Sequence, residues 1–462
     1  MNRFVFGERA PLERANFESK TRIPPISGLT ECRAELLPGM VNVWYEYLPA
    51  CYDGKTPLPL IVQVHGGGND GRRWANFTLW HILAERLGLI VIYPNSPDYG
   101  SWHCDDRDVE FLYKLIGLVE EKYAVDRSRV YMQGMSNGDM MTLAFTMQHP
   151  EMLAAAGYST GPSAEVYVGD ERPVGALPAI QMRGEYDIIF RQTENDPLDV
   201  FETRYRINDF NREIWTRANG LDAIPALTAR GKDNFLRFKG KNADLINWEI
   251  VGCGHREPAD MAQVYWDTLY SGCRRVDGKL EYGPCVDALE PDRDVAVIAL
   301  GSRKVYASGR IEEMTELETG VVRQFDPGPG NYTKTVNKKE MLETPALCAP
   351  VEFFRAAFGA GIEYLDAGDR VRVCFPDGNE AIFYSNSLLV EYNGRFRGMR
   401  KPCSLLCGTF YVPVGEFCGD FMGKFVSEAG DCMLISGHSA ILGRYTARIL
   451  RALLGGYVRA IE

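Results

Sequence analysis

No long hydrophobic run occurs in this chain of 462 residues. A membrane-spanning helix needs roughly 18 or more consecutive apolar residues, so the sequence predicts no membrane span. The first twenty residues mix Arg, Glu and Asn and lack the apolar segment of a signal peptide. The sequence therefore predicts a cytoplasmic protein; an extracytoplasmic location would require a wrongly assigned start or a non-standard export route.

Clustered positive charge is also missing. The formal net charge is -11, and the Lys and Arg residues form no dense tract. Nucleic acids and anionic membranes bind basic surfaces, so neither is expected as a partner.

Histidine is scarce, with six residues, and the twelve cysteines are scattered. Cys403 and Cys407 are the only closely spaced pair, and neither a second pair nor a nearby histidine accompanies them. The sequence therefore predicts no metal site and no cofactor. Because a secretion signal is absent, we expect buried free thiols rather than disulfides.

What the chain does contain is an alternation of apolar strand-like runs with amphipathic helical patterns. This alternation predicts an α/β fold with a doubly wound, mostly parallel sheet, whose chemistry lies at the carboxyl ends of the strands. Residues 41–48 are expected to form a strand at the edge of this sheet. The other predicted strands are 58–64, 89–93, 129–133, 154–159, 179–183 and 247–251, and the predicted helices are 74–86, 108–123, 139–148 and 260–270.

A chain of this length is expected to form two or three domains. Two polar stretches, 161–177 and 192–244, interrupt the α/β pattern, and the second is expected to fold over the strand ends as a lid. The predicted segments are an N-terminal arm or edge strands over 1–35, the α/β domain over 36–275, a linker over 276–293 and a smaller α+β domain over 294–462.

The C-terminal part contains an internal repeat, Pro350-Val-Glu-Phe-Phe354 and Pro413-Val-Gly-Glu-Phe417. Each copy predicts a short helix after the proline and then a turn into a strand, at 370–375 and 432–435. The smaller domain is therefore expected to have two related halves.

A serine stands between a strand-like run and a helical pattern in Gly134-Met135-Ser136-Asn137-Gly138. A serine on so sharp a turn has its hydroxyl exposed above the sheet, and the N-terminus of the following helix favours developing negative charge. The two glycines let the strand and helix backbones approach closely. With 46 glycines in the chain, however, the pentapeptide alone is a weak signal, and its context has to decide.

A nucleophilic serine needs a base, an acid that orients the base, and donors for the oxyanion. His255 follows a strand on a glycine-rich loop after Ser136, which is the chain order Ser, acid, His of the α/β-hydrolases. His255 is therefore the predicted base. The other histidines are His65 in a glycine turn, His81 in a helical pattern, His103 in a loop, His149 before Pro150 and His438 in the C-terminal domain.

Asp187 is the predicted acid, because Arg183-Gly-Glu-Tyr-Asp187 follows the strand at 179–183 and lies between the serine and the histidine. Glu185 and Asp196 are alternatives. Any one of the three could instead be a solvated loop carboxylate.

The oxyanion donors are expected to be the backbone N–H of Asn137 and an N–H of the glycine turn at 65–68, most directly that of Gly67. His65 is expected to fix this turn by hydrogen bonding.

Three further residues are expected to contact substrate. Trp102 and His103 follow the strand at 89–93 and are predicted to line an acyl or aromatic pocket, and Tyr186 lies beside the predicted acid. A packed loop tryptophan is the alternative for Trp102.

Together these stretches resemble the polyhydroxybutyrate depolymerase and feruloyl esterase family of α/β-hydrolases over residues 40–272. The resemblance implies carboxylic-ester hydrolysis and supports the roles given to the serine, the acid and the histidine. Two positions depart from the family pattern: Asp139 stands where the family often has glycine, and Arg183 replaces the first residue of a more usual His-Gly-x-x-Asp. The matching stretches are Val64-His65-Gly66-Gly67-Gly68, Ser101-Trp102-His103, Asp108-Val109-Glu110-Phe111-Leu112, residues 123–131, Gly134-Met135-Ser136-Asn137-Gly138 and Gly252-Cys253-Gly254-His255.

Residues 294–436 are similar to the copper amine oxidase N-terminal-like domain, through the strand that begins at Asp294 and the two Pro-Val-x-x-Phe repeats. The name implies no copper, and the single histidine of the C-terminal domain could not hold it. The resemblance implies an extracytoplasmic setting, which conflicts with the missing signal peptide.

The sequence thus predicts a serine esterase that hydrolyses a small or polymer-linked ester of feruloyl, acetyl or hydroxyalkanoate type through an acyl-enzyme. The alternative is a surface or cell-wall binding protein with a degenerate hydrolase domain, whose C-terminal domain contacts polysaccharide or cell wall. A peptidase on the same fold is a third hypothesis, and it has no sequence mark of its own.

Overall fold

A computed structural model describes residues 26–98, 100–161, 173–187, 200–315, 320–324, 346–406 and 408–455, with backbone alone for 200–207. The chain divides into two compact units. The first comprises Met1–Pro225 and Phe235–Leu289, and the second comprises Ala226–Asn234 and Glu290–Glu462.

The first unit is built on one large sheet, in the order β1-β2-β4-β3-β5-β6-β7-β10-β9. The strands from β4 through β3, β5, β6 and β7 to β10 are parallel, whereas β1 and β2 pair antiparallel at one end. This topology confirms the predicted doubly wound α/β-hydrolase sheet. The strands are β1 (Leu29–Leu37), β2 (Met40–Tyr47), β3 (Leu58–Val64), β4 (Ile90–Pro94), β5 (Val125–Met135), β6 (Ala155–Ser159), β7 (Ala179–Gly184), β9 (Asp233–Phe238) and β10 (Leu245–Ile250).

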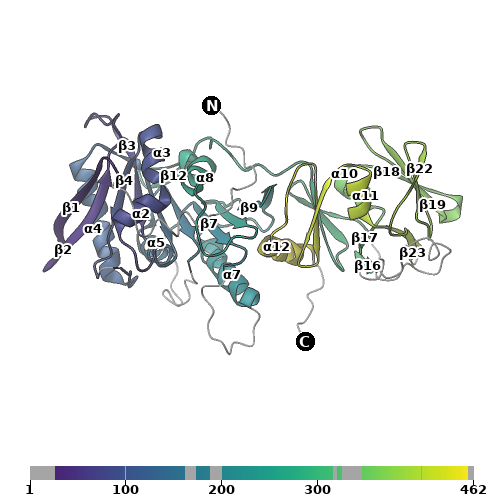
Figure 1. Cartoon of the computed structure of the whole chain (residues 1–462), viewed down its shortest axis with the longest axis horizontal. Helices are drawn as coiled ribbons and strands as arrows, with labels where there is room; N and C mark the ends of the chain where they lie inside the picture. Colours follow the sequence, from purple (N-terminus) through teal and green to yellow (C-terminus); the bar gives the residue numbers. More distant parts are fainter. Residues whose placement is uncertain are drawn as a thin grey trace. The chain divides into compact units, whose positions relative to one another are not determined.

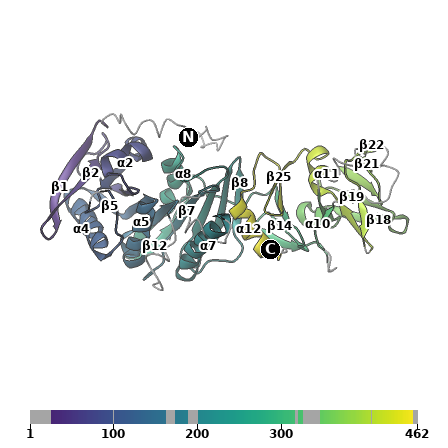
Figure 2. The same ribbon diagram turned by 60° about the horizontal axis from the view of Figure 1, so that its bottom comes forward.

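Helices cover both faces of this sheet, as a right-handed succession of strand and helix requires. In Figure 1 α3 and α8 lie toward the top of this unit and α4, α5 and α7 toward the bottom, and Figure 2 shows α2 on the same side as α8. Because both faces are covered, β4, β6, β7 and β10 are buried along their whole length and β3 along all but its first residue, as the apolar run of β3 predicted. The helices are α2 (Gly71–Thr78), α3 (Trp80–Leu87), α4 (Asp106–Lys122), α5 (Asn137–Gln148), α7 (Val200–Asn219) and α8 (Met261–Thr268), with short 3-10 turns η2 (Pro150–Met152) and η3 (Tyr270–Gly272).

Aromatic side chains pack η3, the short turn after α8, against β5, the strand that leads to Ser136. The rings of Tyr131 on β5 and Tyr270 on η3 stack with centroids 4.7 Å apart. The Tyr270 hydroxyl donates to the carbonyl of Met132 at 2.9 Å. Burying a ring of this size stabilises the fold by roughly 2–3 kcal/mol. The chain segment that carries His255 is thereby held close to the strand that carries Ser136.

Two local predictions in this unit are wrong. The edge of the sheet is β1, so Val41 and its neighbours in β2 form the second strand rather than the edge. The helix expected over 74–86 is two helices, because Leu79 adopts left-handed backbone angles between α2 and α3. No glycine or proline marks that break, and the sequence pattern runs on through it.

The lid predicted over 192–244 is also corrected. Residues 200–219 form the long helix α7 on one face of the sheet. Residues 233–238 form strand β9, the neighbour of β10, and 226–230 form strand β8 (Ala226–Arg230) of the second unit. Residues 188–199 of the predicted lid, and 162–172 of the other polar stretch, lie outside the described residues.

The boundary between the units lies later than the predicted end of the α/β domain at 275. Residues 273–282 form a hairpin of β11 (Cys273–Val276) and β12 (Lys279–Tyr282), so the first part of the predicted linker is structured. Leu289 is buried in the core of the first unit. The next residue, Glu290, belongs to the second unit, where its carbonyl accepts from Thr228 Oγ1 at 2.9 Å.

The described residues of the second unit form three small antiparallel sheets and three short helices around a core of their own. Its sheets have the orders β15-β14-β13-β26-β25, β16-β17-β24-β23 and β18-β19-β20-β21-β22. The elements are β13 (Val295–Ala299), β14 (Lys304–Ala307), β15 (Arg310–Glu313), β16 (Val322–Gln324), β17 (Ala346–Pro350), α10 (Phe353–Phe358), β18 (Gly361–Leu365), η5 (Asp366–Gly368), β19 (Arg370–Cys374), β20 (Glu380–Tyr384), β21 (Leu389–Tyr392), β22 (Arg395–Gly398), β23 (Ser404–Leu406), β24 (Thr409–Val412), α11 (Val414–Asp420), β25 (Phe425–Ala429), β26 (Cys432–Ser436) and α12 (Arg444–Leu454).

The internal repeat is confirmed in this unit. Each copy runs from a strand through a short helix into a hairpin, β17-α10-β18-β19 in the first and β24-α11-β25-β26 in the second. The two strands that precede the helices pair with each other, with Ala349 opposite Val412. Phe354 and Phe417, at matching places in the repeat, pack edge to face with ring centroids 5.4 Å apart.

Cysteine behaves as predicted in the part of the chain that the structure describes, where eleven cysteines are present as free thiols. Most of them are buried. Among the described helices, none is long and apolar enough to cross a bilayer.

Candidate active site

Ser136 occupies a single-residue turn between β5, which ends at Met135, and α5, which begins at Asn137. Its backbone has φ 57° and ψ -118°, an unfavourable conformation for a residue with a Cβ. The Ser136 N–H donates to the carbonyl of Ser159 at the end of β6, at 2.8 Å. The neighbouring strand thus holds the strained turn in place, with the hydroxyl above the sheet.

The glycines on either side of the turn are required by close backbone contacts. A Cβ on Gly134 would lie 2.0 Å from the carbonyl oxygen of Gly138. A Cβ on Gly138 would lie 2.4 Å from the carbonyl oxygen of Val64 on β3. Both distances are far below van der Waals contact, and both opposing atoms are backbone, so neither site can relax cheaply.

We expect the Gly134→Ala variant to lose about 4 kcal/mol or more of its free energy of unfolding, because the added methyl overlaps the first turn of α5. Gly117→Ala is the matched control: Gly117 lies inside α4, and nothing lies within 4 Å of an added Cβ. Its free energy of unfolding should stay equal or rise by up to about 1 kcal/mol. Denaturant unfolding of both variants measures this, and equal stabilities would contradict the close-packed turn.

The structure brings Ser136, His255 and Asp187 together. His255 Nε2 lies 2.9 Å from Ser136 Oγ, and His255 Nδ1 lies 3.1 and 3.0 Å from the two carboxylate oxygens of Asp187. An ionised carboxylate accepts hydrogen bonds only, so Nδ1 carries the proton. Nε2 is then unprotonated and accepts from the serine hydroxyl. The Asp187 side chain is fully buried and the His255 side chain is 13% exposed.

Glu185, one of the two alternatives for the acid, does not occupy this place. Glu185 Oε2 accepts from the N–H of Gly252 at 2.9 Å, so this carboxylate contacts the loop that leads to the histidine. Asp196 lies outside the described residues. The close approach of the two loops also depends on Gly184, where a Cβ would lie 2.3 Å from the carbonyl oxygen of Gly254.

The glycine turn that follows β3 lies beside the nucleophile turn. A Cβ on Gly67 would be 3.6 Å from Asn137 Cβ, so the two predicted oxyanion residues are neighbours. The next residue, Gly68, has a positive φ of 72° and donates its N–H to the carbonyl of Gly100 at 2.5 Å. The turn thus contacts the first turn of α5 on one side and the loop after β4 on the other.

His65 supports this turn from within the core, as predicted. It is fully buried, its Nδ1 lies 2.8 Å from the carbonyl oxygen of Gly66, and its Nε2 accepts from the N–H of Ser96 at 3.1 Å. Burial lowers the pKa of His65 to about 4. The ring is therefore neutral at physiological pH, with the proton on Nδ1.

Trp102 links the two halves of the oxyanion region rather than lining an open pocket. Its indole N–H donates to the carbonyl of His65 at 3.0 Å. Its backbone N–H donates to Asn137 Oδ1 at 2.7 Å, and its carbonyl accepts from Asn137 Nδ2 at 3.0 Å. The side chain is 3% exposed, so the packed loop tryptophan is the arrangement found.

The other two predicted substrate residues lie at the surface. The imidazole of His103 is more than half exposed, and its Nε2 lies 2.9 Å from Asp98 Oδ2. Its backbone N–H donates to Asp108 Oδ2 at 2.6 Å, which fixes the loop at the start of α4. Tyr186, next to Asp187, is 44% exposed. Both side chains are open to contact with a ligand.

Glu257 is a nearby ionisable residue that the sequence interpretation missed. Its Oε1 accepts from Gln133 Nε2 at 2.5 Å, and Gln133 also donates to Ser159 Oγ at 3.0 Å. Burial raises the pKa of Glu257 to about 7, and the Asp139 charge adds to the increase. In the sequence, only the position of Glu257 two residues after His255 suggested that it lies near the site. The sequence does not show that the loop carrying Glu257 folds back onto β5.

This raised pKa predicts a pH dependence of stability. The carboxyl is protonated in the folded protein up to about pH 7 but ionises near its ordinary value when unfolded, so its contribution to the free energy of unfolding falls as the pH rises between those values. Glu257→Gln cannot ionise. Relative to wild type, the variant should therefore gain stability between pH 5 and pH 8, as measured by urea unfolding, and a difference that stays constant with pH would contradict the raised pKa.

Within the described residues, no group of three or more His, Cys, Asp or Glu side chains is placed to hold a metal ion. The site brings together a serine, a histidine and a buried aspartate in a chain of hydrogen-bonding contacts.

Residues 44–177 match the family described as Esterase PHB depolymerase. This part of the chain is similar to that family. The matched residues include Ser136 and the glycine turn, whereas Asp187 and His255 lie beyond them. The match therefore covers Ser136, and the structure places His255 and Asp187 next to it.

Several proteins similar to this chain are named as acetylxylan or feruloyl esterases. The chain is 23% identical over 223 residues to the bifunctional acetylxylan esterase/xylanase XynS20E of Neocallimastix patriciarum, covering 45% of this chain and 30% of that protein. It is 29% identical over 135 residues to feruloyl esterase B of Neurospora crassa, covering 27% and 46% respectively. The chain thus spans less than half the length of either relative.

Among solved structures, the acetyl xylan esterase from Aspergillus awamori aligns with 51% of this chain and 97% of its own, at 18% identity and a TM-score of 0.41. A likeness this low adds nothing to the assignment.

Proposed function

We propose that the protein is a serine esterase that hydrolyses carboxylic esters of feruloyl, acetyl or hydroxyalkanoate type. One observation carries this proposal: His255 contacts Ser136 Oγ through one ring nitrogen and both Asp187 oxygens through the other. A serine hydroxyl is a weak nucleophile alone, and a base oriented by a buried carboxylate is the arrangement that activates it.

In the proposed reaction Ser136 Oγ attacks the ester carbonyl while His255 Nε2 takes the hydroxyl proton. The tetrahedral intermediate collapses when His255 returns that proton to the leaving alcohol, which leaves an acyl-enzyme. Water then attacks the acyl group, with His255 again as base, and releases the acid and free Ser136. Asp187 holds the imidazole tautomer throughout and stabilises the imidazolium.

The negative oxygen of the intermediate would be met by the backbone N–H groups of Asn137 and Gly67. Each such donor contributes on the order of 3 kcal/mol to transition-state stabilisation, so the geometry of both turns matters. Trp102 and His65 would keep that geometry, because they bond to the two turns rather than to the substrate.

The direct test is hydrolysis of a panel of esters: p-nitrophenyl acetate and butyrate, methyl ferulate, acetylated xylan and 3-hydroxybutyrate oligomers. We expect release of acid from at least one class, and covalent inactivation by diisopropyl fluorophosphate with one modification at Ser136. No release from any ester, together with cleavage of a peptide anilide, would favour the peptidase hypothesis and overturn this one.

The predicted contact with polysaccharide or cell wall stays a proposal for the second unit. A cavity of about 790 Å³ in that unit supports it, because aromatic and charged side chains lie together on its walls. These include Phe358, Tyr392, Arg355 and Asp377. Retention of the full chain on an insoluble xylan or cell-wall fraction, reduced in a Tyr392→Ala variant, is the expected result.

A further inference from the structure

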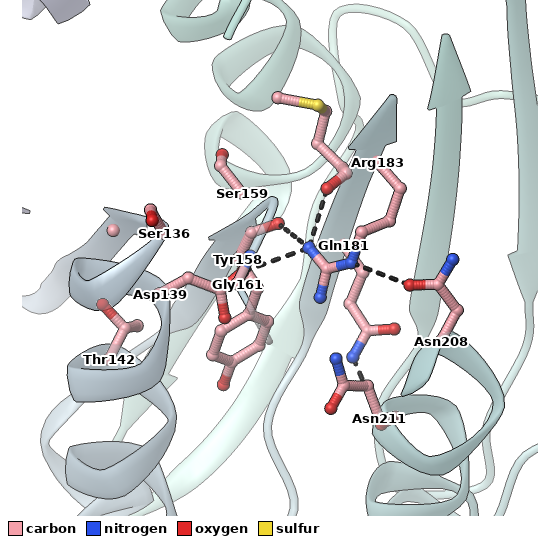
Figure 3. A network of polar contacts seen from close by, with 12 residues as sticks. Ser136, Asp139, Thr142, Tyr158, Ser159, Gly161, Gln181, Arg183, Asn208 and Asn211 are labelled. Atoms are coloured by element: carbon pink, nitrogen blue, oxygen red, sulfur yellow. Dashed lines mark hydrogen bonds and ion pairs between the residues drawn. The ribbon is translucent and has the colours of Figure 1, made fainter. Parts of the chain in front are cut away.

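Asp139 and Arg183, the two positions that depart from the family pattern, meet in the structure. Arg183 Nη1 lies 3.1 Å from Asp139 Oδ2, and the two side chains are 5% and 2% exposed. Asp139 lies in the first turn of α5, three residues after Ser136, and Arg183 lies on β7, four residues before Asp187. Figure 3 shows Arg183 between this turn of α5 and the helix α7.

Further hydrogen bonds fix both side chains in place. Arg183 Nη1 donates to the carbonyls of Met182 at 2.7 Å and Tyr158 at 3.3 Å, and Nε donates to Asn208 Oδ1 on α7 at 3.1 Å (Figure 3). Asp139 Oδ2 accepts from the N–H of Gly161, just after β6, at 2.7 Å. The pair therefore connects the first turn of α5 with the ends of β6 and β7, and β7 leads to Asp187.

Neither charge is tolerable at this depth without the other. Removing one partner of a buried ion pair leaves an uncompensated charge, which costs far more than the pair itself gains. A glycine at 139 would leave Arg183 unpaired, and an uncharged residue at 183 would do the same to Asp139.

The pair also affects the field at the nucleophile. The N-terminus of α5 is the end that favours negative charge, and it lies beside the proposed oxyanion position. A carboxylate alone in the first turn would oppose the negative oxygen of the intermediate. The guanidinium of Arg183 balances that carboxylate, so the helix end keeps its preference for an anion.

We propose that Arg183 and Asp139 are a positioning pair, which holds the acid-bearing loop against the nucleophile turn without adding net charge and takes the place of the histidine and glycine of the family pattern. This inference rests on the proposed function, because it assigns the pair a role at the same site. Both residues act through Ser136 and Asp187 rather than on the reacting atoms.

A charge cycle in the full-length protein tests the pair. Asp139→Asn removes the negative charge and keeps an acceptor for the Gly161 N–H, and Arg183→Met removes the positive charge and keeps the length of the side chain. Each single variant should lower kcat for p-nitrophenyl butyrate by about 30-fold, whereas the double variant should stay within about fivefold of wild type. Additive losses in the double variant would overturn the proposal.

The pH profile of kcat/KM separates positioning from simple loss of stability. Asp187 contacts His255 Nδ1, and the charge of Asp139 raises the pKa of Glu257, two residues along the chain from His255. Arg183→Met leaves a negative charge close to the site and should move the acidic limb of the profile to higher pH. Asp139→Asn should move it to lower pH, and the double variant should restore it. Shifts in one direction for all three variants would contradict the pair.

Two controls keep the result unambiguous. If a single variant does not fold, recovery of a folded, active protein in the double variant supports the pair, and a double variant no better than the worse single one overturns it. The rate of Ser136 labelling by diisopropyl fluorophosphate is measured in the same four proteins. Failure of wild type to hydrolyse any ester would count against the proposed function, whereas the labelling rates would still show whether the two residues are coupled.

Discussion

The Ser136→Ala variant is expected to hydrolyse its best ester with kcat/KM about 10⁴-fold or more below wild type. Without Oγ no acyl-enzyme can form, and His255 has no hydroxyl to deprotonate. A residual rate above the uncatalysed one is expected, because the two backbone donors still stabilise an oxyanion formed by direct attack of water. The measurement is initial-rate kinetics on purified protein, with the fold checked by circular dichroism.

Ser128→Ala is the matched control for this variant. Ser128 lies on the same strand, far from its carboxyl end, and its hydroxyl donates to Asp126 Oδ1 at 2.6 Å. Its loss should change kcat/KM by less than about twofold. Equal rates for Ser136→Ala and wild type would contradict the serine esterase proposal, and a large loss in Ser128→Ala would show that the assay reports stability rather than chemistry.

The nucleophile and its base could be predicted because their signals are local. A strand, a tight turn and a helix are each visible in short windows of sequence, and Gly134 and Gly138 are forced by contacts within that window or with the next strand. His255 could be assigned by chain order, since in this sheet the loops that follow parallel strands meet at one edge.

The break in the first helix could not be predicted for a physical reason. Leu79 adopts left-handed angles, which tertiary packing imposes on a residue that carries no turn signal of its own. The prediction of a lid over residues 192–244 was also wrong. Residues 226–238 are polar enough to resemble a loop, yet they form strands β8 and β9, which are neighbours in the sheet and are separated by only two residues.

The Arg183 and Asp139 contact shows the same limit at the site itself. Each residue was recognised as a departure from the family pattern, but they are 44 positions apart, and nothing in one sequence pairs them. The fold places the end of β7 beside the first turn of α5, and for this reason Arg183 and Asp139 form an ion pair. A buried charge at a strand end is thus a reason to look for a partner on the neighbouring helix.

The identity of the acid depended on the register of one short turn. Glu185 and Asp187 are two residues apart after β7, and the sequence pattern alone does not show which of the two carboxylates contacts the histidine. In the structure Tyr186 donates its backbone N–H to the carbonyl of Cys253, and Asp187 donates its own to Gly184. In this register the Asp187 carboxylate contacts the imidazole of His255, and the Glu185 carboxylate accepts from the N–H of Gly252.

The Asp187→Asn variant is therefore expected to lose about 10⁴-fold in kcat, because an amide can donate to Nδ1 and so stabilise the wrong imidazole tautomer. Glu185→Gln, which keeps an acceptor for the Gly252 N–H, should lose less than about threefold. The tautomer argument adds a second expectation: raising the pH should not rescue Asp187→Asn to wild-type rates at pH 8, since the fault lies in which nitrogen carries the proton. A larger loss in Glu185→Gln than in Asp187→Asn would reverse the assignment of the acid and would place the turn in the other register.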